Sequence, residues 1–300
     1  MELISTVIIT YKRPLKVLSR AVQSVLNQTH DNLELIIVND APEEKMLAQE
    51  IYTYIDSLKD QRIKYVEHVQ NSGANVARNT GLNYATGKYI AYLDDDDEWL
   101  PQKLEKQLTA IQQEHNIGLV YSGFYINDDT GNNVVRSIVI PKKDYLAALI
   151  EDNYIGSTSF PLLLTEAVRK VGGFDTQLKS CQEYELWLRI AQKYKIQGIR
   201  DILGVYHISQ DSTFKGNYKS YLEGDTAILS IHIDLFKEYP VEYSNHLLRM
   251  YVYMLNAKEF KKALYYKKRA FLACWYNINN LTLVYYLRQS IKKLHRWFYV

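Results

Sequence analysis

Apolar and polar positions along the first hundred residues alternate between two patterns. Runs of strand length that are apolar almost throughout, such as LISTVIIT and LELIIVND, are separated by segments with apolar residues at helical spacing. One such segment follows Pro14 and places Leu15, Leu18, Val22 and Val25 on one face. Buried strands separated by helices predict a mainly parallel sheet that is covered by helices on both faces.

The same alternation continues to residue 93. We expect a helix over 43–58, a strand over 62–68, a helix over 74–86 that Gly87 closes, and a strand over 88–93.

Beyond residue 117 the pattern changes. Strand-like segments at 117–126 and 133–140 flank the turn-like NDDTGNN, which predicts an antiparallel pair and therefore a mixed sheet. Further helices are expected over 144–151, 165–171 and 182–194, and the chain looks helical from about residue 218 onward. Within that last part, NAKEFKKALYYKKRAF has the alanine and aromatic spacing of a helical hairpin, which alone is too little for a repeat array.

Polar side chains follow three of the expected strands. Thr10 and Tyr11 end the first, Asn39 and Asp40 end the second, and the aspartates of 94–97 end the fourth. Ligands of open α/β sheets bind beyond the carboxyl ends of the strands, so these residues are candidates for a binding site.

Four adjacent carboxylates in YIAYLDDDDEWLP repel one another, and burial raises that cost. They therefore require either open water or a bound cation. Asp97 has two alternatives, a ligand role or a cap on the backbone before a helix that Pro101 opens.

Composition narrows the class of protein. A chain of 300 residues with 47% hydrophobic and 23% charged residues is globular and long enough for one large α/β domain with an appendage. Its two cysteines, Cys181 and Cys274, are far apart and match no metal-ligand spacing. The start of the chain lacks the basic region and the small-residue cleavage site of a signal peptide, and its apolar run is only as long as a strand. We therefore expect a cytoplasmic location.

Charge is distributed unevenly. Residues 245–300 hold eleven Lys and Arg and one acid, whereas residues 1–244 hold 25 basic and 33 acidic residues. The segment 270–287 is uncharged, but its interior asparagines and threonine argue against a membrane span. Two roles stay open for these C-terminal helices: peripheral contact with the anionic inner face of a membrane, or packing on the catalytic domain or on a second subunit.

Six landmarks occur in order: VIITYKRP (7–14), ELIIVNDA (34–41), NSGANVARNTGL (71–82), YIAYLDDDDEWLP (89–101), VGGFD (171–175) and CQEYELWLRIA (181–191). In order and spacing the chain resembles a family 2 glycosyltransferase across residues 3–210. The resemblance implies the GT-A fold, a Rossmann-like mixed and mainly parallel sheet flanked by helices. We expect a catalytic domain over 1–215 and a helical C-terminal region over 216–300.

The resemblance also implies an activity. Family members transfer a sugar from a nucleotide diphosphate to an acceptor hydroxyl, so we expect an inverting, metal-dependent enzyme that uses a UDP-sugar and either Mn²⁺ or Mg²⁺. The expected acceptor is a surface glycan or a lipid-linked oligosaccharide, and no nucleic-acid partner is expected. Such a site must neutralise the charge that grows on the leaving diphosphate, which a divalent cation held by hard oxygen ligands can do.

Individual residues are carried over by position. In the Asp-x-Asp motif, Asp96 corresponds to the metal ligand and Asp94 to the residue near the ribose and the metal. Asp95 is the variable middle residue and is grouped with the nucleotide-binding positions.

Four further positions are expected to bind the nucleotide. Tyr11, beside Thr10, can stack on the base or meet its edge. Asp40 can accept a proton from the edge of uracil or guanine, and Arg78 of the ARN segment lies by resemblance near the base.

Glu183 corresponds to the catalytic base, although relatives usually have an aspartate there, which is one methylene shorter. Glu185 points roughly 200° away around the helix and cannot share that role. His207 corresponds to a late histidine that reaches the metal or the diphosphate in some relatives, whereas a lone histidine is otherwise a local hydrogen-bonding residue.

Two other functions are compatible with these features. A nucleotidyltransferase can share the sheet and the metal, but the chain has no recognisable glycine-rich triphosphate loop after the first strand. A glycan-binding or nucleotide-binding subunit without catalysis is suggested by Gln182-Glu183 in place of Glu-Asp, although Glu183 keeps a carboxylate.

Overall fold

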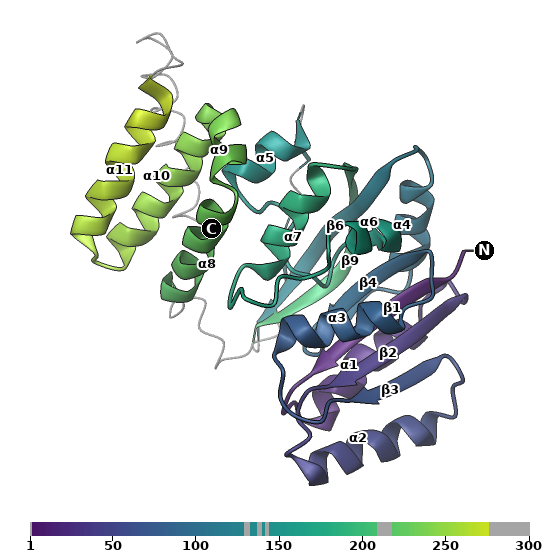
Figure 1. Ribbon diagram of the computed structural model, residues 1–300. Coiled ribbons are helices and arrows are strands. Elements are labelled where there is room, and N and C mark those ends of the chain that lie inside the picture. The colour runs from purple at the N-terminus through teal and green to yellow at the C-terminus, as the bar shows by residue number, and fades with distance from the viewer. Residues whose placement is uncertain (1, 129–132, 137–139, 142–143, 209–217, 276–300) are drawn as a thin grey trace. The chain divides into compact units, whose positions relative to one another are not determined.

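The computed structural model (Figure 1) describes residues 2–128, 133–136, 140–141, 144–208 and 218–275. The chain divides into two compact units, which are described separately. Unit 1 comprises residues 1–145, 154–177 and 182–213, and unit 2 comprises residues 146–153, 178–181 and 214–300. The boundary expected at residues 215 and 216 lies outside the described residues.

Unit 1 contains a mixed sheet, as the strand patterns predicted. Among the described residues it has nine strands, in the order β3-β2-β1-β4-β8-β6-β9-β5 with β7 beside β6. The strands are β1 (Ile4–Thr10), β2 (Leu33–Asn39), β3 (Ile63–Glu67), β4 (Tyr89–Asp94), β5 (Glu98–Trp99), β6 (Ile117–Asp128), β7 (Asn133–Arg136), β8 (Leu162–Leu164) and β9 (Lys195–Ile208).

The first four strands are parallel, and their register decides where the polar residues meet. Thr10 of β1 is paired with Asn39 of β2, and Ile9 of β1 with Asp94 of β4. The carboxyl ends of these strands therefore lie at one edge of the sheet, where a ligand can approach.

Helices cover both faces of these strands. The helices of unit 1 are α1 (Leu15–Leu26), α2 (Lys45–Leu58), α3 (Ala74–Tyr84), α4 (Lys103–Ile111), α6 (Thr165–Lys170) and α7 (Gln182–Ala191). Ile4 and Ile8 of β1 lie in one buried cluster with the apolar face of α1. Val7 faces α3, so closely that a Cβ added to Gly81 would lie 2.3 Å from its side chain. Gly81 is therefore needed for α3 to approach the sheet.

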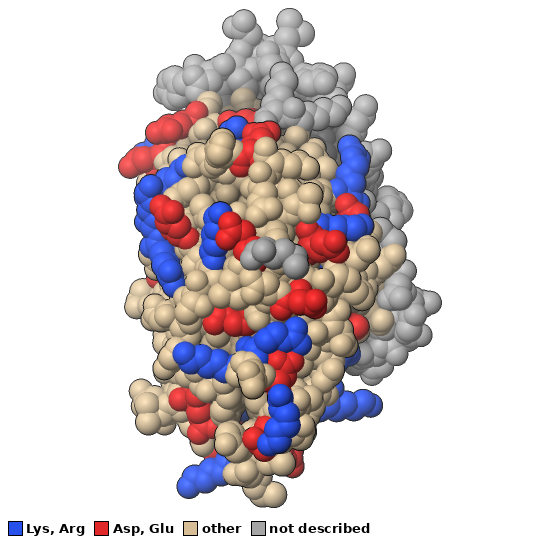
Figure 2. Space-filling model, turned by 90° about the vertical axis from the view of Figure 1, so that its right-hand side faces the viewer, with Lys and Arg blue, Asp and Glu red and all other residues tan. Residues whose placement is uncertain are grey.

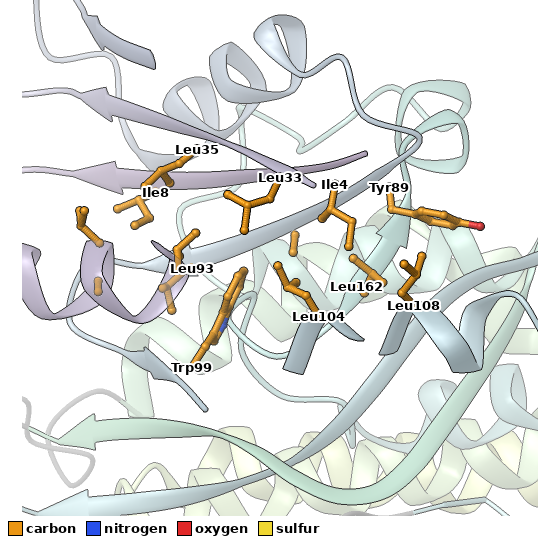
Figure 3. Packing of buried hydrophobic residues seen from close by; sticks show 14 of the residues in the cluster. Ile4, Ile8, Leu33, Leu35, Tyr89, Leu93, Trp99, Leu104, Leu108 and Leu162 are labelled. Atoms are coloured by element: carbon orange, nitrogen blue, oxygen red, sulfur yellow. The ribbon is translucent and has the colours of Figure 1, made fainter. Parts of the chain in front are cut away.

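The main core lies between the sheet and the helices α1 and α4 (Figure 3). Ile8, Leu33 and Leu93 of the strands pack there with Leu104 of α4 and with Trp99. Fully burying one such aliphatic side chain contributes about 1.5–3 kcal/mol, so this layer holds the strand ends in place.

Two expected helix ends are wrong. Gly87 does not close α3, which ends at Tyr84 with Ala85 in extended backbone. Gly87 is needed for a different reason, because a Cβ there would lie 2.7 Å from the carbonyl oxygen of Leu3. The helix expected over 182–194 ends at Ala191, because the chain turns there into β9.

Unit 2 is helical, and its helices are α5 (Tyr145–Glu151, from residue 146 on), α8 (Tyr218–Ile231), α9 (Ile233–Glu238), α10 (Pro240–Asn256) and α11 (Phe260–Trp275). The expected hairpin is confirmed, since α10 and α11 pack side by side (Figure 1) and the Ser244 hydroxyl donates to the Ala270 carbonyl at 2.9 Å. The part of the uncharged segment beyond residue 275 lies outside the described residues.

Arg249 is the polar centre of unit 2. Its guanidinium pairs with Asp152 and, at 3.1 Å, with Asp225, and it donates to Nδ1 of His246 at 3.1 Å. The two carboxylates offset the desolvation cost of burying this cation. In the part of the chain that the structure describes, no helix combines the length and the apolar character needed to cross a membrane.

One face of the molecule is shown in Figure 2, where Lys and Arg side chains are interspersed with Asp and Glu. Mixed charge of this kind keeps the local field small and supports solubility.

Candidate active site

Asp94 ends β4 and is the most strongly paired of the four aspartates. Its carboxylate accepts from Arg78 at 2.8 Å and from the hydroxyls of Thr158 at 3.1 Å and Ser157 at 3.2 Å. Burial alone would raise its pKa, but Arg78 and these hydroxyls hold the pKa of Asp94 below its ordinary value. Asp94 is therefore a stable anion.

Asp95 and Asp96 share one cation, Arg13. Its Nε donates to Asp95 at 2.9 Å and its Nη2 to Asp96 at 2.9 Å. Burial raises the pKa of Asp95 to about 6 in spite of Arg13, and burial together with the charge of Asp94 raises the pKa of Asp96. The Asp96 side chain is 40% exposed, whereas that of Asp95 is 8% exposed, so Asp96 is the one that solvent reaches.

Asp97 points into the protein and is fully buried. It accepts from the Ser159 hydroxyl at 2.5 Å and from the backbone N–H of His207 at 3.3 Å, and burial raises its pKa well above the usual range. The capping alternative is wrong, because α4 begins at Lys103 after Gln102 and has no side-chain cap. Asp97 instead connects the turn after β4 to β9 and to the segment before β8.

His207 comes close to the aspartates through β9, which pairs with β5. Its backbone contacts Asp97, and its ring Nε2 lies 3.4 Å from Glu98 Oε2. The ring holds the pKa of Glu98 below its ordinary value. The structure thus places His207 beside the aspartate run, and its role toward a metal stays a prediction.

Asp40 follows β2 and is almost completely buried. Its carboxylate accepts from the backbone N–H groups of Ser72 and Gly73, both at 2.8 Å, and from Nδ1 of His68 at 2.7 Å. The other ring nitrogen of His68 lies 2.9 Å from the Thr80 hydroxyl on α3. Asp40 therefore fixes the loop that leads into α3, where Gly73 has the positive φ of 89° that favours glycine.

Thr10 and Tyr11 lie at the same edge. Thr10 is buried and its carbonyl accepts the backbone N–H of Asp40 at 2.9 Å, whereas Tyr11 is 48% exposed. An exposed ring at the end of a strand can cover the flat face of a bound base. The backbone turns at once after it, since Lys12 has a positive φ of 51°.

Glu183 lies in the first turn of α7 and is half-buried. Burial raises its pKa, the positive charge of Arg78 lowers it, and the negative charge of Asp94 raises it, with a net rise. Glu183 is therefore close enough to Arg78 and Asp94 to feel both charges, although it is far from them in the sequence.

The loop 171–175 is held between α3 and α7. On one side, Asn79 exchanges two hydrogen bonds of 2.8 Å with the backbone of Phe174, and Asn75 donates to the Asp175 carbonyl at 2.7 Å. The Phe174 ring lies 5.4 Å from the Arg78 guanidinium carbon.

On the other side of this loop, Arg189 donates to the carbonyls of Val171 at 2.5 Å and Gly173 at 2.7 Å. It also forms a two-pronged ion pair with the buried Glu185, one turn away on α7. Glu185 thus orients Arg189 toward the loop.

Several of these residues were not anticipated. Arg13 and His68 contact the expected carboxylates, and the hydroxyls of residues 157–159 surround Asp94 and Asp97. The only signals in the sequence are the Lys-Arg-Pro after the first strand and the hydroxyl run GSTS, and both are common in ordinary loops.

Among the described residues, no group of three or more His, Cys, Asp and Glu side chains is arranged to hold a metal ion. One exposed carboxylate, Asp96, beside the anionic Asp94 nevertheless fits the way Mg²⁺ is bound in phosphate-transfer sites, where one or two carboxylates act together with substrate phosphates and water.

Comparison with known proteins decides the family. The model of the family described as Glycosyl transferase family 2 matches residues 5–172, which is more than half of the chain. The chain belongs to glycosyl transferase family 2. The resemblance drawn from the six landmarks is thereby confirmed, and the protein is a glycosyltransferase.

Curated relatives agree with this assignment. An uncharacterized glycosyltransferase, MJ1057, of Methanocaldococcus jannaschii is 34% identical over 221 residues, which are 72% of this chain and 74% of the relative. The Escherichia coli protein WfgD, named UDP-Glc:alpha-D-GlcNAc-diphosphoundecaprenol beta-1,3-glucosyltransferase, is 31% identical over 204 residues, 67% of this chain and 76% of the relative.

Solved structures of glycosyltransferases share the fold. Residues 1–349 of Staphylococcus aureus TarS, solved with UDP-GlcNAc, match with a TM-score of 0.60 at 16% identity and cover 84% of this chain and 73% of that chain. The mannosyltransferase PcManGT from Pyrobaculum calidifontis, solved with GDP-Man and Mn²⁺, matches with a TM-score of 0.62 at 15% identity and covers 97% of this chain and 80% of that chain. The family 2 enzyme therefore has the expected GT-A fold with a helical C-terminal region.

Proposed function

We propose that this glycosyltransferase is an inverting, metal-dependent enzyme that transfers a hexosyl or N-acetylhexosaminyl residue from a UDP-sugar to an acceptor hydroxyl. The observation that carries the proposal is the ion pair of Arg78 with Asp94, beside the exposed Asp96 and with charges that act on the Glu183 carboxylate. The printed donor of WfgD and the ligand of TarS support UDP as the nucleotide.

The nucleotide would lie across the carboxyl ends of β1, β2 and β4. Tyr11 would cover the base, and Asp40 would accept a proton from its edge. Thr10 and Asp95 would line the same end of the strands, and Arg78 would orient Asp94 beneath the nucleotide.

Asp96 would hold Mn²⁺ or Mg²⁺, with Asp94 beside it and His207 nearby. The cation would neutralise charge on the departing diphosphate. Arg13 now neutralises Asp96, so this side chain is already oriented toward a positive charge.

Glu183 would act as the base. As the acceptor oxygen forms its bond to the anomeric carbon, the bond to the diphosphate breaks, UDP leaves with the electron pair, and the acceptor proton passes to the Glu183 carboxylate. A carboxylate whose pKa is raised by burial is a better proton acceptor near neutral pH than an exposed one.

The proposed acceptor is a surface glycan or its lipid-linked precursor, as the printed name of WfgD suggests. The enzyme would then work in the cytoplasm at the inner face of the membrane, with residues 1–215 carrying out catalysis and the helices of 216–300 serving attachment or self-association. Family membership gives no support to a nucleotidyltransferase.

UDP-sugar turnover by the wild type, Asp96→Asn and Glu183→Gln, each with and without a chelator, tests the proposal. We expect loss of activity with the chelator and in both variants, each by on the order of a hundredfold or more, because each removes a group that acts in the transition state. UDP binding should survive in Glu183→Gln.

Glu166→Gln is a matched control, since Glu166 is an exposed carboxylate in the first turn of α6. Full activity of Glu183→Gln would exclude Glu183 as the base. Turnover that a chelator does not change would contradict the proposed metal dependence. UDP binding without turnover in the wild type would favour the non-catalytic alternative.

A further inference from the structure

The helix α11 has one buried side. Ala263, Tyr266 and Ala270 recur at i, i+3 and i+7 and are buried within unit 2. This narrow stripe of small and aromatic residues is the side that α10 covers, as the contact between Ser244 and Ala270 shows. Residues 260–262, 264, 265, 267, 268, 271 and 272 of the helix are exposed.

The opposite side, which we call the α11 outer face, is both apolar and basic. It consists of two rows with a spacing of four residues: Phe260, Leu264, Lys268 and Leu272, and beside them Lys261 and Tyr265. Phe260 is 67% exposed, Leu264 66%, Tyr265 55% and Leu272 48%, and both lysines are exposed. Single exposed apolar residues are ordinary, but four on one face of one helix mark an interaction surface.

The charge of α11 identifies the kind of partner. The helix carries Lys261, Lys262, Lys267, Lys268 and Arg269 and no acidic residue. A second copy of this chain packed on the α11 outer face across a two-fold axis would bring Lys261 and Lys268 of both copies together, because such an interface pairs a patch with itself. An anionic partner meets them without that repulsion.

We infer that the α11 outer face docks on the surface of an anionic lipid bilayer. The exposed phenylalanine, leucines and tyrosine enter the boundary between headgroups and acyl chains, and the lysines remain at the level of the phosphates. This inference rests on the attachment role proposed above for the C-terminal helices, and it does not depend on the donor, the acceptor or Glu183.

Vesicle flotation of the full chain tests it, with vesicles of phosphatidylcholine alone and vesicles of an equimolar mixture with phosphatidylglycerol. We expect the wild type to float only with the mixture. Lys261→Gln/Lys268→Gln should weaken binding on the order of twentyfold, since each basic residue near such a surface contributes about fivefold. Phe260→Gln/Leu264→Gln/Leu272→Gln should abolish flotation.

Met46→Gln/Tyr52→Gln is the matched control, because both side chains are exposed on α2 of unit 1. It should float like the wild type. UDP binding and far-UV circular dichroism of each variant check that the chain is folded. If the wild type does not bind UDP, the proposed donor is contradicted, but the inference about membrane docking is not affected.

Two results would overturn the inference. One is that the wild-type protein does not float with the anionic vesicles. The other is an apolar triple variant that floats normally but changes from dimer to monomer in light scattering, which would assign the α11 outer face to self-association.

Discussion

The four consecutive aspartates differ in their hydrogen-bond partners and in their pKa values, because each has different neighbours in the fold. Asp94 is held as an anion by Arg78, Asp95 and Asp96 share Arg13, and Asp97 is buried against a serine hydroxyl and a backbone amide. Burial raises the pKa of the last three, whereas the pKa of Asp94 is lowered because its cation outweighs burial.

His68 is expected to position Asp40 for the nucleotide base. His68→Leu removes the 2.7 Å hydrogen bond to a buried carboxylate, so UDP binding should weaken about tenfold to a hundredfold. Calorimetric titration of UDP and of ribose 5-diphosphate checks this, because only the ligand that carries the base should lose affinity. His115→Leu is the exposed control, and equal losses for both ligands would reduce His68 to a general structural role.

At the scale of elements, the site depends on how α3 and α7 hold the loop between α6 and α7. Asn75 and Asn79 on α3 bind the backbone of residues 174 and 175, and Arg189 on α7 binds that of residues 171 and 173. Because Arg78 and Glu183 lie on the same two helices, the loop also sets the distance between these two side chains.

Arg189→Gln should destabilise this clamp. It leaves the buried Glu185 without its cation, which typically costs about 3–5 kcal/mol of unfolding free energy. The double variant with Glu185→Gln should recover part of that loss, since no charge is then buried alone. Urea denaturation measures both, and a double variant no more stable than Arg189→Gln would contradict the explanation.

At the scale of the whole chain, the sheet brings the candidate site residues together, and residues 245–300 carry eleven Lys and Arg against one acidic residue. In unit 2, His246 is completely buried beside Arg249 and the ring of Phe236. Burial lowers the pKa of His246 from 6.5 to about 4, so the folded chain keeps this imidazole neutral.

The stability of unit 2 should therefore fall on acidification. Between pH 6.5 and 4, His246 binds a proton in the unfolded chain but not in the folded chain. This difference lowers the unfolding free energy by about 3 kcal/mol over that pH range. Hydrogen exchange in α10 at several pH values measures this. His246→Gln should show a smaller slope, and an unchanged slope would mean that another group titrates.

The candidate residues were found because sequence order and strand ends carry local information. The helices after Pro14 and over residues 45–58, the hairpin of α10 and α11 and the positions of Thr10, Asp40, Arg78 and Asp94 follow from periodicity and from the six landmarks. The short strands β5 and β8 were not anticipated, because two or three residues have no periodicity to detect. The pairing of β9 with β5 was not anticipated either, because it joins segments about a hundred residues apart in the sequence.

Local patterns along the chain thus decide which elements form, which family the protein belongs to and which polar residues stand at strand ends, because these depend on spacing of a few residues. The partner of each charge was decided only on folding. Arg13 meets Asp95 and Asp96 across 82 and 83 positions, and Ser159 meets Asp97 across 62. Such pairs depend on strand order and helix packing. The pKa values and the exposure that distinguish Asp96 from its neighbours therefore depend on the tertiary structure as well.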